Sequence, residues 1–334
     1  MRVVADSDLD GLMAAAVLKA SKPELEVHFA HPALLRSGNL DHLIDRQTAI
    51  CDLPFHKACG LYLDHHLTNR PTHEEEIEFE STGGICHWRD TPSAARAAFD
   101  LMKDELDLSH LEEVMPIVDA LDSGGISLQE FMEDGPIIRL SRSLSMSDPE
   151  HMQEVMHQFA SGMKLEDILE SHKPRLDELK HEREIMAEIV RNSTTIIDGL
   201  AICDLSETGH RSNGYLVTAL AGSDAIACCV IHGYMDGSIE DVNRPALGAS
   251  FYANSFRGEA NPYDLSILAT LLDETGGGHA NACGCRIQPS DGSKRNLIHG
   301  DKESNLENWI KKWSKRDSEM KRQSILIGED IIIR

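Results

Sequence analysis

Short β-branched segments alternate with helical segments over the first seventy residues, and this alternation constrains the fold more than any other feature. Residues 11–21 are rich in Ala and Leu and favour a helix. Residues 38–46 are a candidate for a second helix. Strands are predicted at 2–5, 25–30, 49–52 and 61–64. Such alternation is typical of βαβ units and predicts a mainly parallel sheet.

Three aspartates stand at the ends of predicted strands. Asp6 follows the first strand, Asp52 closes the third and Asp64 closes the fourth. In open parallel sheets, functional residues gather beyond the carboxyl ends of the strands. We therefore expect a functional site at this edge.

The length of 334 residues favours two domains. Residues 93–180 read as amphipathic helices, and Pro174 divides a short helix that ends near His172 from a longer one. Strand-like segments return after Ser193, then a charged helix at 303–322 and an apolar edge strand at the end of the chain. We predict an α/β protein with an N-terminal parallel-sheet domain, a helical connector and a smaller C-terminal domain with a mixed sheet, with a cleft between the domains. The predicted bounds are 1–160, 161–194 and 195–334.

Composition excludes several classes of function. Asp and Glu number 56 against 32 Lys and Arg, a net charge of −24, so the surface would repel a long nucleic acid. No uncharged apolar run approaches the ~18 residues of a membrane span, and the start lacks the apolar segment of a secretion signal. We expect a cytoplasmic protein with reduced thiols, not bound to membranes or long duplexes, and we leave a homodimer open.

The segment Asp6-Ser-Asp8-Leu-Asp10-Gly11 places three carboxylates close together. Their mutual repulsion is costly unless a cation neutralises it. An EF-hand would need a preceding helix and an acidic residue at its twelfth position, which is Val17 here, so that alternative fails. A solvated acidic turn remains an alternative for this motif alone.

A second motif, from Leu63 to Asn69, places His65 and His66 directly after Asp64. At the end of a strand both imidazoles can turn toward one site, although one could simply cap a turn. Asp52 is well placed to bridge two metal ions.

The C-terminal half contains the run Gly276-Gly277-Gly278-His279, preceded by Arg257. A glycine run lets backbone amides approach a ligand, and a guanidinium binds phosphate or carboxylate. His279, Cys283 and Cys285 could instead form a zinc site, but the usual CxxC spacing and a second ligand pair are missing.

Together these motifs resemble the DHH phosphoesterase superfamily, in the subgroup with a C-terminal DHHA1 domain. The resemblance spans residues 6 to 284. Its motifs, in family order, are DxDxDG, the strand-end Asp52, LDHHLTN, the segment Val118-Asp119-Ala-Leu-Asp122-Ser-Gly-Gly and GGGHxxAxG.

The resemblance implies two divalent cations, usually Mn²⁺, with Mg²⁺ as the alternative. Asp119 matches the fourth motif better than its reserve Asp122, and Asp6 stands where many members have His. His66 is expected near the scissile phosphate. Arg257 and Gly276, Gly277, Gly278 and His279 match the substrate-binding motifs. The matched metal ligands are Asp6, Asp8, Asp10, Asp52, His65 and Asp119.

The implied function is a phosphodiesterase that hydrolyses short oligonucleotides or linear dinucleotides to mononucleotides. Carboxylate and imidazole ligands suit Mn²⁺ or Mg²⁺, and two such ions can activate a water for attack on phosphorus. The alternatives are a phosphoanhydride hydrolase of the exopolyphosphatase or pyrophosphatase kind and a cyclic-dinucleotide phosphodiesterase.

Overall fold

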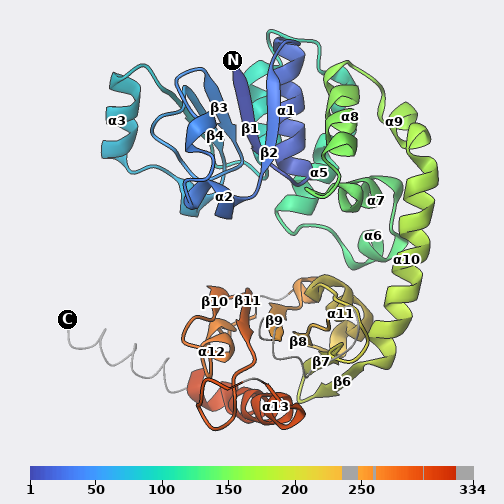
Figure 1. The fold of residues 1–334 in the computed structure, drawn as a ribbon. Coiled ribbons are helices and arrows are strands. Elements are labelled where there is room, and N and C mark those ends of the chain that lie inside the picture. The colour runs from blue at the N-terminus through green and yellow to red at the C-terminus, as the bar shows by residue number, and fades with distance from the viewer. Residues whose placement is uncertain (235–246, 259–260, 296, 321–334) are drawn as a thin grey trace, which may run out of the picture. The chain divides into compact units, whose positions relative to one another are not determined.

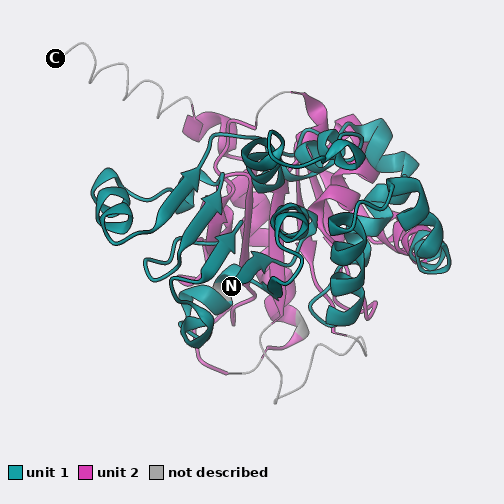
Figure 2. Ribbon diagram, turned by 90° about the horizontal axis from the view of Figure 1, so that it is seen from above, with its two compact units in different colours: residues 1–181 teal, residues 182–334 magenta. Residues whose placement is uncertain are grey.

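The computed structural model describes residues 1–334 except 235–246, 259–260, 296 and 321–334. The chain forms two compact units, Met1–His181 and Glu182–Arg334, coloured separately in Figure 2. The predicted C-terminal edge strand lies outside the described residues.

Unit 1 contains a five-stranded parallel sheet in the order β2-β1-β3-β4-β5 (Figure 1). The strands are β1 (Arg2–Asp6), β2 (Glu26–Ala30), β3 (Thr48–Cys51), β4 (Leu61–Asp64) and β5 (Ile85–Trp88). Both faces are buried: Val3 and Ala5 of β1 belong to one apolar cluster, whereas Val4 belongs to the cluster on the other face.

The helices of residues 9–21 and 93–180 follow the predicted segments, whereas α2 (Pro32–Arg36) and α3 (His73–Ser81) lie outside them. Residues 38–46, where a helix was expected, contain only the short 3-10 turn Asp41–Leu43. The helix of this region, α2, lies earlier in the chain, at Pro32–Arg36. Pro174 lies in the first turn of α10, as predicted. The remaining helices are α1 (Leu9–Ser21), α3 (His73–Ser81), α4 (Ala94–Met102), α5 (Met115–Asp122), α6 (Leu128–Glu133), α7 (Pro136–Ser143), α8 (Pro149–Ala160), α9 (Leu165–Ser171) and α10 (Lys173–Asn192), the last of which continues into unit 2.

Unit 2 contains a six-stranded mixed sheet in the order β10-β11-β9-β8-β7-β6. Its one parallel pair is β7 with β8. The strands are β6 (Thr194–Ile197), β7 (Leu200–Asp204), β8 (Ala227–Ile231), β9 (Gly248–Ala253), β10 (Gly277–His279) and β11 (Ala282–Arg286); the helices are α11 (Gly214–Ala221), α12 (Ser266–Ala269) and α13 (His299–Trp313). The α/β prediction, with a parallel sheet followed by a mixed one, is confirmed.

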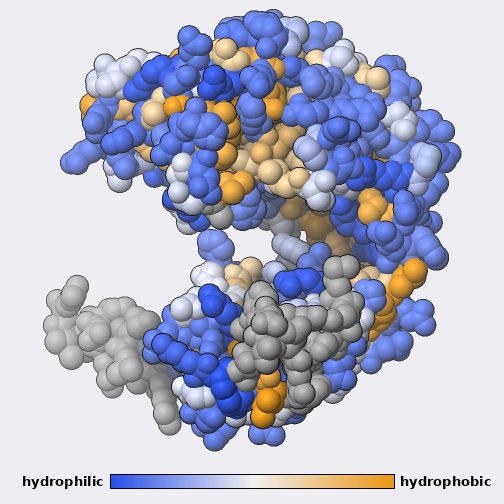
Figure 3. Space-filling view, in the orientation of Figure 1, coloured by the Kyte–Doolittle hydropathy of each residue, from blue (hydrophilic) through white to orange (hydrophobic). Residues whose placement is uncertain are grey.

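The surface drawn in Figure 3 is largely hydrophilic on both units, as the charge of the chain predicts. Among the described residues, no helix combines the length and the apolar character needed to cross a bilayer.

Candidate metal centre

The carboxyl ends of β1, β3 and β4 meet at one edge of the parallel sheet, because these strands are neighbours in the sheet. Asp6 ends β1, Asp52 directly follows β3, and Asp64 ends β4 and precedes His65 and His66. The topology therefore brings these five side chains to the same edge.

Helix α1 begins at this edge. Asp8 is its N-cap and accepts a hydrogen bond of 2.9 Å from the Gly11 amide. Asp10, in the first turn, is only 2% exposed, and its two oxygens accept bonds from the amides of Ala94 and Ala95 at 2.8 and 2.7 Å. Gly11 is required here, since a Cβ would lie 2.5 Å from the Asp6 carbonyl oxygen.

Asp52 has left-handed backbone geometry, with φ of 57°. This region is costly for residues other than glycine, and Asp and Asn adopt it more often than most. The side chain is buried, and its Oδ1 makes no hydrogen bond. The strand end thus directs a buried carboxylate oxygen with no hydrogen-bond partner into the cluster.

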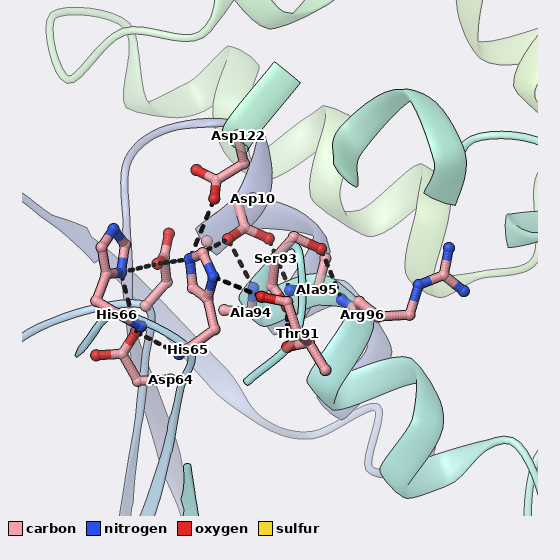
Figure 4. A network of polar contacts seen from close by, with 12 residues as sticks. Asp10, Asp64, His65, His66, Thr91, Ser93, Ala94, Ala95, Arg96 and Asp122 are labelled. Atoms are coloured by element: carbon pink, nitrogen blue, oxygen red, sulfur yellow. Dashed lines mark hydrogen bonds and ion pairs between the residues drawn. The ribbon is translucent and has the colours of Figure 1, made fainter. Parts of the chain in front are cut away.

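His65 is oriented by the carbonyl of Thr91, which lies 3.1 Å from its Nδ1. The carbonyl can only accept, so Nδ1 carries a proton and Nε2 is left to face the cluster. This Nε2 is buried and lies 3.6 Å from Asp10 Oδ2 (Figure 4). It also lies 3.8 Å from Asp52 Oδ1. In histidines that bind a metal, the ring nitrogen that does not face the metal typically donates a hydrogen bond to a group such as a backbone carbonyl.

His66 and Asp64 form the outer part of the cluster. Nδ1 of His66 lies 3.1 Å from Asp64 Oδ1 and 3.3 Å from Asp52 Oδ1. Asp64 accepts from the amides of His65 and His66 and from the Tyr62 hydroxyl at 2.6 Å. Burial opposes ionisation of Asp64, but these bonds outweigh it and lower the pKa of the carboxyl. Asp64 therefore positions the two imidazoles.

The remaining carboxylates repel one another. Burial, with the charges of Asp122 and Asp8, raises the pKa of Asp10 to about 8. Burial and the neighbouring Asp10 raise the pKa of Asp52 far above its ordinary range, and burial and Asp8 raise that of Asp6 to about 6. Only added positive charge would let all of them ionise together.

The two aspartates of the fourth motif, Asp119 and Asp122, have different partners. Asp119 lies against Arg96, with Oδ2 3.0 Å from Nε and 2.6 Å from Nη2, and also accepts from the Ser93 hydroxyl. Asp122, one turn later on α5, has Oδ2 3.1 Å from His65 Nε2. The guanidinium of Arg96 thus neutralises Asp119, whereas Asp122 belongs to a group with Asp10 and His65 that could hold a metal ion.

At this edge of the sheet, the side chains that could hold a metal ion form two groups that share His65; a third candidate group, His151, Glu154 and His172, lies elsewhere in unit 1. One group contains Asp52, Asp64, His65 and His66, and the other Asp10, His65 and Asp122. The buried Asp52 Oδ1, the Nε2 of His65 and the carboxylates around them fit divalent cations with oxygen and imidazole ligands.

The substrate-binding candidates all belong to unit 2. Arg257 ends a short 3-10 turn and donates to the Ser223 carbonyl at 2.7 Å. Gly278 has φ of 138°, and a Cβ there would lie 2.6 Å from the Ala282 carbonyl oxygen, so the turn needs glycine. His279 is exposed and pairs with Ala282 across the β10–β11 ladder.

A cavity of about 380 Å³ lies beside these candidates, within unit 2. Ser255 and Gly258, on either side of Arg257, line it together with Ala282. Two tyrosines and three asparagines add ring faces and amides, namely Tyr215, Tyr252, Asn254, Asn261 and Asn281.

The zinc alternative receives no support from the described residues. Cys283 is in the core of unit 2, and burial raises the pKa of both Cys283 and Cys285 to about 12, so neither is a ready thiolate. His279 forms no metal-ligating group with them among the residues that the structure describes.

The sequence motifs do not predict strand β5, nor the contacts that Thr91 and Tyr62 make with the cluster. Thr91, which orients His65, contributes a backbone carbonyl and so has no side-chain signature. The sequence places Tyr62 in the predicted strand 61–64 but does not predict the hydrogen bond from its hydroxyl to Asp64. The strand-like run from Ile85 to Trp88, after two glycines, is the one signal that could have revealed β5.

The chain shares its fold with known hydrolase structures. Its sequence matches no protein-family model and no curated protein. A pGpG-specific phosphodiesterase, PggH of Vibrio cholerae, is 19% identical, with a TM-score of 0.73 over 94% of this chain and 99% of that one. Exonuclease RecJ bound to manganese is 13% identical, with a TM-score of 0.50 over 92% of this chain and 89% of that one. The fold expected from the DHH–DHHA1 resemblance is confirmed.

Proposed function

We propose that this protein is a metal-dependent phosphodiesterase. The observation that carries the proposal is a buried group of carboxylates around His65 Nε2, in which Asp52 Oδ1 makes no hydrogen bond and, among the described residues, no lysine or arginine pairs with Asp10 or Asp52. The fold supports it, because the neighbours in structure include a phosphodiesterase and an exonuclease that was solved with manganese.

The donor set fits two divalent cations, Mn²⁺ or Mg²⁺. Asp52 and His65 lie where the two groups adjoin, and we assign Asp52 as the bridging ligand. The other ligands would be Asp6, Asp8, Asp10 and Asp122. Bound there, the cations would supply the Lewis acidity that hydrolysis of a diester needs.

His66 would act on the substrate. It is 44% exposed, whereas His65 is 11% exposed, and its Nδ1 is held by Asp64, which leaves Nε2 for a ligand. The hydrogen bond to Asp64 raises the pKa of His66, although burial opposes the shift. A protonated imidazole beside the cluster would stabilise negative charge on a phosphoryl oxygen.

Short oligonucleotides or linear dinucleotides are the proposed substrates. The net charge of −24 disfavours long polymers, whereas a dinucleotide can be held by a few local donors. In unit 2, we assign Arg257 and Gly276–His279 to a phosphate that is not being cut, and the tyrosine-lined cavity next to them fits a nucleobase.

The test is a Mn²⁺-supplemented panel of pGpG, other dinucleotides, 5-mers, cyclic dinucleotides, pyrophosphate and polyphosphate. We expect the highest kcat/KM on linear dinucleotides and no turnover after metal removal. Preference for polyphosphate or pyrophosphate would replace the proposal with a phosphoanhydride hydrolase, and preference for cyclic dinucleotides would replace the linear substrate.

A further inference from the structure

Arg70 and Trp88 form a stacked pair in unit 1 that the proposed centre does not use. The guanidinium carbon of Arg70 lies 4.4 Å from the centre of the Trp88 ring. Trp88 ends β5 opposite Asp64 in the β4–β5 ladder, and Arg70 follows His66 by four residues. The pair is therefore adjacent to the candidate metal centre, in the same unit.

The stack is connected to the centre by hydrogen bonds. Nε1 of Trp88 donates to the His66 carbonyl at 3.0 Å, so the indole is held against the backbone of the exposed imidazole. At the other end of this loop, the Tyr62 hydroxyl lies 2.6 Å from Asp64 Oδ2 and 3.0 Å from the Asn69 carbonyl. These contacts hold the loop that carries Arg70 at both ends and position its side chain.

Arg70 has no carboxylate partner among the described residues, although acidic residues far outnumber basic ones. Arg96, in contrast, binds Asp119 at 2.6 Å, and Arg142 binds Asp134 at 2.8 Å. Arg70 is exposed, and Trp88 is half-buried. An exposed, unpaired guanidinium lying over an indole offers a flat cationic surface beside the site.

We propose that this stack is a nucleobase-binding subsite for a nucleotide that adjoins the scissile phosphodiester. The inference rests on the proposed function and adds a base contact within unit 1. Bases that are splayed from a single strand stack on aromatic rings and on arginine planes, with little dependence on base identity. Because its central carbon lies over the indole, the guanidinium can stack with a base on its other side, giving the order base, Arg70, Trp88.

The test compares a ligand with a base and one without. Binding of GMP and of ribose 5-phosphate is measured by isothermal titration calorimetry in Mn²⁺. We expect the wild type to bind GMP about tenfold more tightly, the scale of one stacked base. GMP should also quench the fluorescence of Trp88, since Trp309 and Trp313 are fully buried in unit 2.

The variants separate stacking from charge. Arg70→Ala should lower the preference for GMP and abolish the quenching of Trp88, while binding of ribose 5-phosphate stays unchanged and the cavity of unit 2 keeps its own base contact. Arg70→Lys, which keeps the charge without the guanidinium, should do the same. Trp88→Phe keeps a ring but loses the bond to His66, and should retain most of the preference. Arg89→Ala is the matched control, because Arg89 is the exposed neighbour of Trp88 but stacks on no ring among the described residues.

An unchanged preference in Arg70→Ala overturns the proposal. So does an equal loss for both ligands, which would make Arg70 a phosphate-binding residue, and so does the same effect in Arg89→Ala. Hydrolysis of bis-p-nitrophenyl phosphate by the wild type tests the proposed function separately. A lack of hydrolysis with the GMP preference intact would reject the phosphodiesterase and leave the stacking subsite standing.

Discussion

Asp301 and Asp204 in unit 2 lie against cations of the protein itself, whereas Asp10 and Asp52 in unit 1 lie against other carboxylates. Oδ2 of Asp301 is 2.6 Å from Arg295, and this bond lowers the pKa of the carboxyl. Burial of Asp204 is outweighed by Lys302, 2.8 Å away, so its pKa is also lowered. For Asp10 and Asp52 the pKa shifts have the opposite sign.

The presence or absence of a lysine or arginine partner distinguishes the carboxylates that the chain itself stabilises from those that we propose to bind metal. A buried carboxylate is stable when a cation or several donors compensate for its lost hydration. In unit 2 the chain supplies that cation. In unit 1, Asp10 and Asp52 have only imidazoles and no lysine or arginine as partners among the described residues, which is costly unless a ligand supplies more positive charge. Asp119 and Asp122 repeat the contrast within one helix, since only Asp119 has an arginine partner.

The largest effect is expected from Asp52→Asn. Loss of the bridging charge should abolish turnover and release at least one cation, as measured by metal analysis of the purified variant. The matched change Asp301→Asn should keep the metal content and turnover but lower Tm by about 2–4 °C, the scale of ~1 kcal/mol in a unit of this size. Two tightly held ions and normal turnover in Asp52→Asn would contradict the contrast between the units.

The next effect concerns His66. His66→Ala should retain both metals and the fold but lose ~10²–10³ in kcat, the cost of one donor to a transition state. Metal content and circular dichroism are the controls. An unchanged kcat would reduce His66 to a polar residue at the end of a strand.

The paired variants Asp122→Asn and Asp119→Asn test the contrast within α5. Asp122→Asn should weaken metal binding by about 10–100-fold or more, since even outer-shell changes cost that much. Asp119→Asn should leave metal affinity nearly unchanged and lower the stability of unit 1, because Arg96 loses its partner. Titration calorimetry with Mn²⁺ measures the first effect, and thermal unfolding measures the second. The reverse pattern would restore Asp119 as the ligand.

Much of the metal centre could be predicted from sequence, because its aspartates and histidines follow strands whose pattern is local. The three strand ends at Asp6, Asp52 and Asp64 lie at one edge for that reason. The choice between Asp119 and Asp122 could not be predicted, since it depends on where Arg96 lies, 23 residues away from Asp119. The carbonyl of Thr91 and the stack of Arg70 on Trp88 are likewise products of tertiary structure.

A smaller effect is expected from Arg257→Ala. Loss of one charge-assisted hydrogen bond, worth roughly 1.5–3 kcal/mol, should lower kcat/KM on 5′-phosphorylated dinucleotides by ~10–150-fold. Metal content should not change. Hydrolysis of bis-p-nitrophenyl phosphate should fall much less, because that diester lacks the distal phosphate. Equal losses on both substrates would mean that Arg257 does not read a distal group.

The smallest effect is a pH dependence of stability that the metal should remove. In the metal-free protein, the pKa of Asp10 is raised to about 8 from an ordinary value of 3.8. The folded chain then holds a proton that the unfolded chain has released, so this stabilisation is complete below pH 3.8 and is lost as the pH rises through about 8. His66 changes in the same direction, because Asp64 raises its pKa. His151 and His232, whose pKa values burial lowers, act in the opposite direction, but only below their ordinary 6.5.

Thermal unfolding between pH 6.5 and 9 therefore isolates the metal centre from these buried histidines. After treatment with EDTA, Tm should fall by about 4–8 °C across this range, as expected for ~2 kcal/mol. Saturating Mg²⁺ should remove the slope, because the ions then hold the carboxylates ionised at both ends of the range, and binding at pH 7 should release protons. Asp10→Asn should reduce the slope without metal, since an amide does not titrate, and leave the part that comes from Asp52 and His66. If the slope were the same with and without Mg²⁺, the carboxylates of unit 1 would be compensated from within the chain, as those of unit 2 are, and the contrast between the units would not identify a metal centre.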